Sequence, residues 1–211
     1  YIEAIQNFDK ATELKPDYEK AWNNKGVSYL TLSQFAEAVK CFDKVLELNP
    51  NNEEVCINKG VALKKLGRIM EAIQAYDRAI SINPTRVEAW YNKANALHEI
   101  GKYSEAVMCF DRVLEKSPGD TTAWFKRGVG LTKLGKPAEA LSCFERVLEL
   151  DQMNPNAHYE RALVLKHFQR KKESMEALDK AVGIQPSYWE AWYELGLLAL
   201  EAKDWNISIK S

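Results

Sequence analysis

The chain has 211 residues, of which 46% are hydrophobic and 28% are charged, as in an ordinary globular protein. Its formal net charge of −1 excludes the strongly basic surface that nucleic acid or an anionic membrane would attract, and no apolar run is long enough to span a bilayer. We therefore expect no nucleic-acid or membrane partner. The four cysteines include no close CxxC pair, so we expect reduced thiols in a cytoplasmic protein.

Residues 1–18 carry one amphipathic helical pattern, and five repeats follow at a constant spacing of 34 residues. In 121–154, apolar residues recur at helical spacing over 122–134 and again over 137–150, so each repeat is predicted to form two helices. Gly135 suits a turn with positive φ, and Pro137 suits the start of the second helix. The full repeats are 19–52, 53–86, 87–120, 121–154 and 155–188, and a truncated repeat, 189–211, is expected to stop midway through a second helix.

Every repeat places similar residues at the same positions. Small residues let two helices approach to about 8–10 Å, and a Pro at the end of most repeats stops the second helix. A pair of helices cannot bury its apolar face alone, which predicts that the repeats stack. The recurring residues are Trp22, Trp90, Trp124 and Trp192; Gly26, Gly60, Ala94, Gly128, Ala162 and Gly196; and Phe8, Phe42, Tyr76, Phe110, Phe144 and Leu178.

These residues resemble the tetratricopeptide repeat (TPR) family along the entire chain. The resemblance implies a single TPR domain over 1–211, in which 1–18 is a half repeat. The implied fold class is all-α, a right-handed α–α superhelical solenoid of 34-residue helix-turn-helix repeats. It also implies that the first helix of each repeat lines a concave groove.

Repeat 155–188 departs most from this pattern. His158 replaces the Trp, Ser174 replaces an Ala, and Gln152 stands where the preceding Pro is expected. Pro155 is predicted to lie in the first turn of the next helix, after an Asn154 cap. The spacing is kept, so we expect the fold to persist with looser packing.

The resemblance places the second, fifth, sixth, ninth and twelfth to thirteenth positions of each first helix in the groove. Its sixth positions begin with three asparagines, and most of its fifth positions are aromatic. The candidate groove residues are Asn24, Asn58, Asn92, Asn95, Lys126, Tyr91, Phe125, Tyr159, Glu160, Tyr193 and Glu194.

An asparagine amide can pair with both the N–H and the C=O of an extended peptide. The alternative is that these amides bond to neighbouring backbone or face water. The aromatic residues could anchor apolar side chains of a ligand or pack against a neighbouring helix. An acidic group at the far end, Glu160, Glu190, Glu194 and Glu201, favours a ligand with a basic end.

Two further columns carry opposite charges. A base recurs at the seventh position and an acid at the twenty-fifth, which favours ion pairs inside or between repeats over a basic ribbon for nucleic acid. The bases are Lys25, Lys59, Lys93, Arg127 and Arg161, and the acids are Asp43, Asp77, Asp111, Glu145 and Asp179.

No arrangement of nucleophile and base, no P-loop and no dinucleotide motif occurs, so we predict no enzyme activity, no cofactor and no metal site. The predicted function is a scaffold that binds a peptide or protein segment in the groove. The alternative is a regulatory or substrate-recruiting TPR arm of a larger enzyme, because a chain that begins with Tyr1 is expected to be a fragment. Apolar faces at both ends also predict end-to-end self-association.

Overall fold

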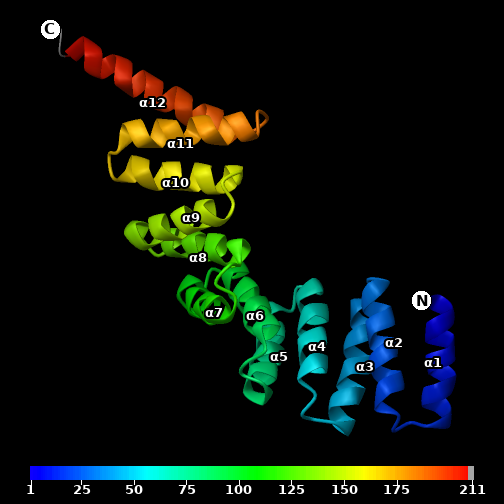
Figure 1. Cartoon of the computed structure of the whole chain (residues 1–211). Helices are drawn as coiled ribbons and strands as arrows, with labels where there is room; N and C mark the ends of the chain where they lie inside the picture. The colour runs from blue at the N-terminus through cyan, green and yellow to red at the C-terminus, as the bar shows by residue number, and fades with distance from the viewer. Residues whose placement is uncertain (209–211) are drawn as a thin grey trace. The chain divides into compact units, whose positions relative to one another are not determined.

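The computed structural model describes the backbone of residues 1–208 and the side chains of residues 1–201. This part of the chain forms twelve α-helices and no strand (Figure 1). The first helices of the repeats are α2 (Glu19–Thr31), α4 (Glu53–Lys65), α6 (Val87–Glu99), α8 (Thr121–Lys133), α10 (Pro155–His167) and α12 (Trp189–Ser208). The second helices are α1 (Ile2–Leu14), α3 (Phe35–Leu48), α5 (Ile69–Ile82), α7 (Tyr103–Lys116), α9 (Pro137–Leu150) and α11 (Lys171–Ile184).

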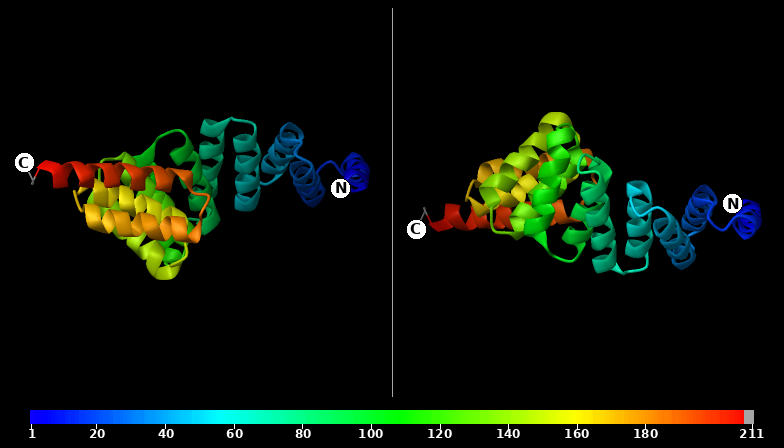
Figure 2. Two further views of the ribbon diagram at one scale, coloured as in Figure 1. Left: turned by 90° about the horizontal axis from the view of Figure 1, so that it is seen from above. Right: turned by 90° about the horizontal axis from the view of Figure 1, so that it is seen from below.

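The helices group into two compact units, an N-terminal unit of Tyr1–Lys116 and a C-terminal unit of Ser117–Ser211. Within each unit every helix packs on the next one along the chain, as the two views in Figure 2 also show. First helices of neighbouring repeats touch as well: α2 contacts α4, α4 contacts α6, and α8 contacts α10. Equivalent positions on these helices therefore line up within a unit. A single domain over 1–211 stays a prediction.

The core of each repeat forms where a large side chain of the second helix meets a small residue of the first. A Cβ atom added to Gly60 would lie 2.4 Å from Cε1 of Tyr76, and one added to Gly26 would lie 2.6 Å from Cε1 of Phe42. These distances are shorter than van der Waals contact, so the recurring small residue is a steric requirement of the helix crossing.

The Trp column holds the loop that joins successive repeats. Trp22 donates a hydrogen bond from Nε1 to the carbonyl of Pro16, six residues earlier, at 2.9 Å. The same bond joins Trp90 to Pro84 at 2.9 Å, Trp124 to Pro118 at 3.0 Å, and Trp192 to Pro186 at 3.0 Å. Each indole therefore satisfies a loop carbonyl that helix hydrogen bonds do not reach.

Where the Trp is missing, another donor takes its place. His158 Nε2 lies 3.0 Å from the carbonyl oxygen of Gln152, again six residues earlier. In the repeat with Cys56, Arg78 Nη2 reaches across from the second helix and donates to the carbonyl of Pro50 at 2.7 Å. The constant separation of six residues between the Trp and the loop carbonyl is the sequence signal for this bond.

Repeat 155–188 keeps close packing between its own two helices. Ser174 donates from Oγ to the carbonyl of Ala162 at 2.8 Å, and both residues are buried. Asn154 Oδ1 accepts from the N–H of Ala157 at 3.0 Å, and Pro155 begins α10, as predicted. The expected looser packing is therefore wrong for the contact between α10 and α11, because the hydroxyl of Ser174 finds an internal partner.

The last predicted turn does not form. The residues with positive φ in the other repeats follow the spacing of 34, at Ser33, Gly67, Gly101, Gly135 and Gln169. The next position in this series is Lys203, but α12 runs unbroken from Trp189 to Ser208. The expected second helix of 189–211 is thus wrong for the described residues. Lys is a good helix former, and unlike Gly it pays an energetic cost for a left-handed turn.

The two kinds of turn residue give a reciprocal test of backbone strain. Gln169 has φ of 60° and Gly135 has φ of 70°, with nothing near a Cβ built on the glycine. A left-handed conformation costs an L-residue about 1–2 kcal/mol. Gln169→Gly is therefore expected to stabilise the protein by up to about 1 kcal/mol, and Gly135→Gln to destabilise it by about as much. Urea unfolding of both variants checks this, and two changes of the same sign would contradict it.

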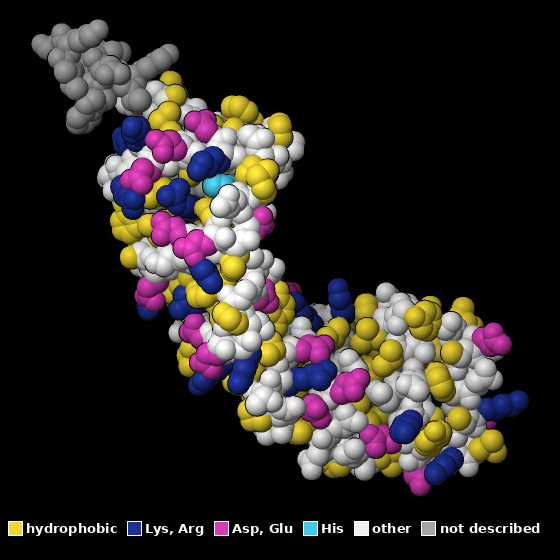
Figure 3. All heavy atoms as spheres, viewed as in Figure 1, with side chains coloured by type: hydrophobic (Ala, Val, Ile, Leu, Met, Phe, Trp, Pro, Cys, Tyr) yellow, Lys and Arg dark blue, Asp and Glu magenta, His cyan; other side chains and the backbone are white. Residues whose placement is uncertain are grey.

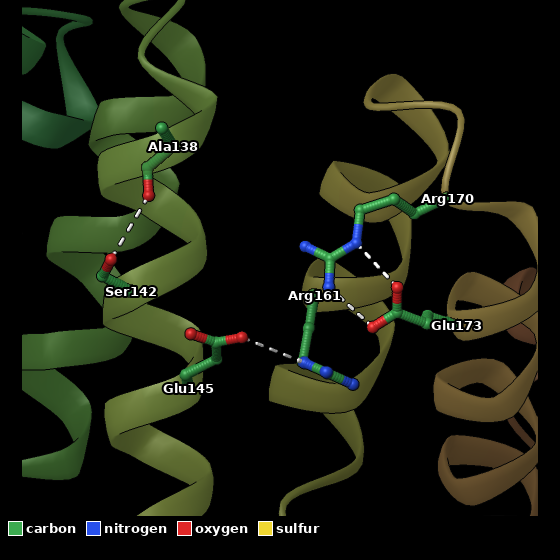
Figure 4. A network of polar contacts seen from close by, with 6 residues as sticks. All are labelled: Ala138, Ser142, Glu145, Arg161, Arg170 and Glu173. Carbon is green, nitrogen blue, oxygen red and sulfur yellow. Dashed lines mark hydrogen bonds and ion pairs between the residues drawn. The ribbon is translucent and has the colours of Figure 1, made fainter.

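The base at the seventh position of one repeat forms an ion pair with the acid at the twenty-fifth position of the preceding repeat. Lys59 Nζ lies 2.5 Å from Asp43 Oδ1, and Lys93 Nζ lies 2.5 Å from Asp77 Oδ1, linking α3 to α4 and α5 to α6. In the C-terminal unit, Arg161 Nε lies 3.8 Å from Glu145 Oε1 (Figure 4). Such half-exposed pairs each contribute about 0–1 kcal/mol, so they stabilise the contact between neighbouring repeats only weakly.

Candidate functional site

Asn24, Asn58 and Asn92 lie at equivalent positions of α2, α4 and α6, the stacked first helices of the N-terminal unit. Asn24 is exposed, and Asn58 and Asn92 are half-buried. Among the described residues, none of the three side-chain amides has a hydrogen-bonding or ionic partner. Three donors and three acceptors are thus available along one face of this unit.

Asparagines in the loops of the same unit behave differently. Asn52 Oδ1 accepts from the N–H of Val55 at 3.1 Å, and its Nδ2 donates to Glu19 Oε1 at 2.8 Å. Asn49 Nδ2 also donates to Glu19, at 3.2 Å. These amides cap a helix or brace a loop, which is the ordinary structural use of the residue. Within the described part of the chain, the amides of Asn24, Asn58 and Asn92 have no such partner.

Most aromatic residues at the fifth position pack within their own unit. The Tyr91 ring meets the Phe110 ring edge-on, with centroids 6.2 Å apart, and the Phe125 and Phe144 centroids are 5.8 Å apart. Tyr159 lies 5.0 Å from Tyr188 by the same measure. The fifth-position rings of Tyr91, Phe125 and Tyr159 are half-buried, so packing against neighbouring helices describes them well. Tyr193 on α12 is exposed.

Further candidates flank the amides in the N-terminal unit. Asn95 is half-buried on α6, three residues beyond Asn92. Lys64 Nζ lies 3.1 Å from Glu99 Oε2 and bridges α4 to α6 at the twelfth and thirteenth positions. This ion pair lies beyond the amides along the two helices.

The acidic end expected in the C-terminal unit is largely neutralised. Glu194 Oε2 lies 2.8 Å from Lys166 Nζ, and Glu201 Oε2 lies 2.9 Å from Lys171 Nζ. The basic residues near the turn of repeat 155–188 thus face these acids from the neighbouring helices. A basic ligand at this end stays a prediction, and it would have to compete with Lys166 for Glu194 and with Lys171 for Glu201.

Glu160 differs from these two acids. It is half-buried on α10 beside a cavity of about 220 Å³, which Leu163 and His167 also line. Burial raises the pKa of Glu160, opposed by the positive charge of Lys133. Lys126, the sixth-position residue of the preceding repeat, is half-buried on α8.

The described side chains form neither a single-sign charged surface on the face drawn in Figure 3 nor a metal site. Basic and acidic side chains intermingle over each unit on the face drawn in Figure 3. The described residues contain no group of three His, Cys, Asp or Glu side chains placed to hold a metal ion. None of the described helices combines the length and the apolar character that crossing a membrane requires.

Protein-family models match most of the chain. Models of the tetratricopeptide repeat match residues 19–52, 87–120, 41–74 and 125–188, and a model named TPR repeat matches residues 60–101. The chain belongs to the tetratricopeptide repeat family. The TPR fold is typically a non-catalytic scaffold for protein interaction. A comparison with curated proteins found no match.

Solved structures of TPR proteins share the fold. The crystal structure of YrrB, described as a TPR protein with an unusual peptide-binding site, has 25% identity and a TM-score of 0.78, covering 93% of this chain and 97% of YrrB. MamA from Desulfovibrio magneticus RS-1 has 20% identity and a TM-score of 0.76, covering 81% and 96% of the two chains. These matches and the helix order confirm the predicted fold class, the all-α TPR solenoid.

Proposed function

We propose that this TPR scaffold binds an extended segment of a partner protein along the N-terminal unit, through the side-chain amides of Asn24, Asn58 and Asn92. The observation that supports this most is that all three amides occupy equivalent positions on stacked helices and have no partner among the described residues. An uncommitted amide offers an N–H donor and a C=O acceptor, which is the complement of a peptide backbone.

The spacing of the repeats suits such a ligand. Neighbouring packed helices lie about 8–10 Å apart, and an extended chain rises about 3.3 Å per residue. Each asparagine would therefore meet the bound segment about every third residue. The asparagines would contact the backbone of the bound segment. Preference for particular residues in that segment would come from other side chains of this chain, such as the half-buried Tyr91 and the exposed Val27. The peptide-binding site described for YrrB supports the same kind of ligand.

Removing two of the amides tests this proposal. Asn58→Ala combined with Asn92→Ala is expected to weaken partner binding by at least about tenfold, because each lost backbone hydrogen bond contributes about 0.5–1.5 kcal/mol. The measurement is a pull-down with the immobilised chain, followed by calorimetry on the partner segment it captures. The matched control combines Asn51→Ala with Gln74→Ala, two exposed amides outside the groove. Equal binding by a folded Asn58/Asn92 double variant would contradict the proposal.

The same groove would serve the alternative function, an arm that recruits substrates or regulates an enzyme domain in a longer polypeptide. The complete sequence of the parent protein distinguishes the two.

We further infer a cytoplasmic location, which is supported by the four cysteines, since all of them are buried free thiols.

End-to-end self-association is a separate proposal. It is supported by apolar side chains exposed on the outermost helices, Trp189 and Trp192 on α12 and Ile2 and Leu14 on α1. Sedimentation of the chain over a range of concentrations tests it. A constant monomer mass at millimolar concentration would contradict it.

A further inference from the structure

One structural position, behind the loop that joins two repeats, is filled differently from repeat to repeat. Where Trp90 occupies it, a cavity of about 250 Å³ remains, lined also by Pro84 and Arg112. Where Cys56 stands in place of the Trp, Arg78 turns in to bond the loop carbonyl, and about 190 Å³ remains. Where His158 stands there, the cavity is about 810 Å³. The imidazole replaces the hydrogen bond of the indole but not its volume.

This hollow, which we call the His158 hollow, combines apolar and charged walls. Leu148 of α9, Met153 of the loop and Ile184 of α11 supply apolar surface. His158 and Lys180 line it as well, with Gln152, Arg161, Glu145 and Glu149 completing the wall. A cavity of this size holds more than one side chain of a ligand.

Four charged side chains line the hollow, and three of them, Glu145, Glu149 and Arg161, form ion pairs. Arg161 lies 3.8 Å from Glu145, as Figure 4 shows, and Arg146 Nη1 lies 2.6 Å from Glu149 Oε2. Lys180 has no ion pair among the described residues. Burial, together with the nearby charges of Lys180 and Arg161, lowers the pKa of His158, opposed by its hydrogen bond with the Gln152 carbonyl and by the charge of Asp151.

The hollow lies on the side of α10 away from the candidate groove. His158 and Glu160 are two residues apart on this helix, and successive residues of an α-helix are turned by about 100°. Their side chains therefore leave the helix about 200° apart, so a ligand in the hollow does not compete with one beside Glu160.

We propose that the His158 hollow is a second binding site, which takes an aromatic side chain of a partner protein together with an adjacent acidic residue. The aromatic ring fills the volume that an indole fills at the same position in other repeats, against Leu148, Met153 and Ile184. The acidic residue pairs with Lys180, which has no ion pair among the residues whose side chains the structure describes. Buried aromatic side chains supply much of the energy of protein interfaces, and a paired charge adds specificity.

The test uses the whole chain, labelled with ¹⁵N, and a short blocked peptide with Trp between two Glu residues. Adding the peptide at about 1 mM is expected to shift the backbone amide signals of Met153, Lys180 and Ile184. Peptides with Ala in place of Trp, or Lys in place of both Glu, are expected to bind at least about tenfold more weakly. Absence of shifts in this region would overturn the proposal.

Two variants distinguish the hollow from other sites. His158→Trp restores the residue usual at this position and occupies the part of the cavity proposed for the ligand's aromatic ring, so it should abolish the peptide-induced shifts while keeping the loop hydrogen bond. Lys180→Glu changes an exposed side chain, keeps the fold, and should weaken binding at least about tenfold even if His158→Trp does not fold. The Asn58/Asn92 double variant should bind the peptide as the parent chain does. Binding that survives Lys180→Glu, or shifts that arise from chain concentration alone through a second copy, would overturn the proposal.

Discussion

Phe110→Ala is expected to lower the free energy of unfolding by about 3–5 kcal/mol. The Phe110 side chain is wholly buried (0% exposed) between α6 and α7, opposite Ala94, and the Tyr91 ring packs edge-on against it. Removing the ring leaves a cavity that the rigid helix pair cannot close. The edge-on contact of Tyr91 is lost with it, at a cost of about 0.5–1.5 kcal/mol.

Urea unfolding followed by circular dichroism measures this loss. Met108→Ala on the same helix is the control, because Met108 is 65% exposed and its truncation should change stability by less than about 0.5 kcal/mol. In a repeat protein each repeat contacts only its neighbours, so hydrogen exchange in the Phe110→Ala variant should accelerate most in α6 and α7. Equal losses from the two variants would contradict the repeat core described above.

Gly60→Leu is expected to destabilise the protein by about 2–3 kcal/mol, although Leu is the better helix former by about 1 kcal/mol. The first side-chain carbon would lie 2.4 Å from the Tyr76 ring, and Tyr76 is itself buried. Because the ring has nowhere to move, the helices must separate. The steric cost is larger than the gain in helix propensity.

The matched control for this substitution is Gly183→Leu. Gly183 lies in the last turn of α11, and nothing is within 4 Å of a Cβ placed there. It should therefore leave stability unchanged or raise it slightly. Thermal unfolding of both variants makes the comparison. A stable Gly60→Leu protein would mean that the crossing of α4 and α5 does not require a small residue.

The sequence predicted the helices of the five full repeats well, because each relies on local patterns that recur. Gly135 and Pro137 mark a turn and a helix start by their own backbone preferences, and both lie where they were predicted to lie. Local preference also explains why the predicted turn near Lys203 does not form. At Lys203 the local preference is helical, since Lys is a good helix former and lacks the freedom of Gly to adopt positive φ.

The site was harder to predict, because it depends on which side chains meet between repeats. The ion pairs of Lys166 with Glu194 and of Lys171 with Glu201 join residues about one repeat apart, so neither charge could be assigned as free from its own repeat. The role of Arg78 in replacing a Trp donor is likewise non-local, since it lies on the other helix of the repeat. By contrast, the shared face of Asn24, Asn58 and Asn92 follows from one helical position and one spacing.

Site-specific photo-crosslinking tests most directly whether a partner lies along the asparagine face. A benzophenone side chain replaces Lys65, which is exposed on α4 seven residues after Asn58 and hence on the same side of the helix, so the asparagines stay intact. A second protein carries the same group in place of Met108, exposed on the second helix α7. If a partner lies along the asparagine face, we expect partner adducts from position 65 and none from position 108. Adducts from position 108 alone would contradict it.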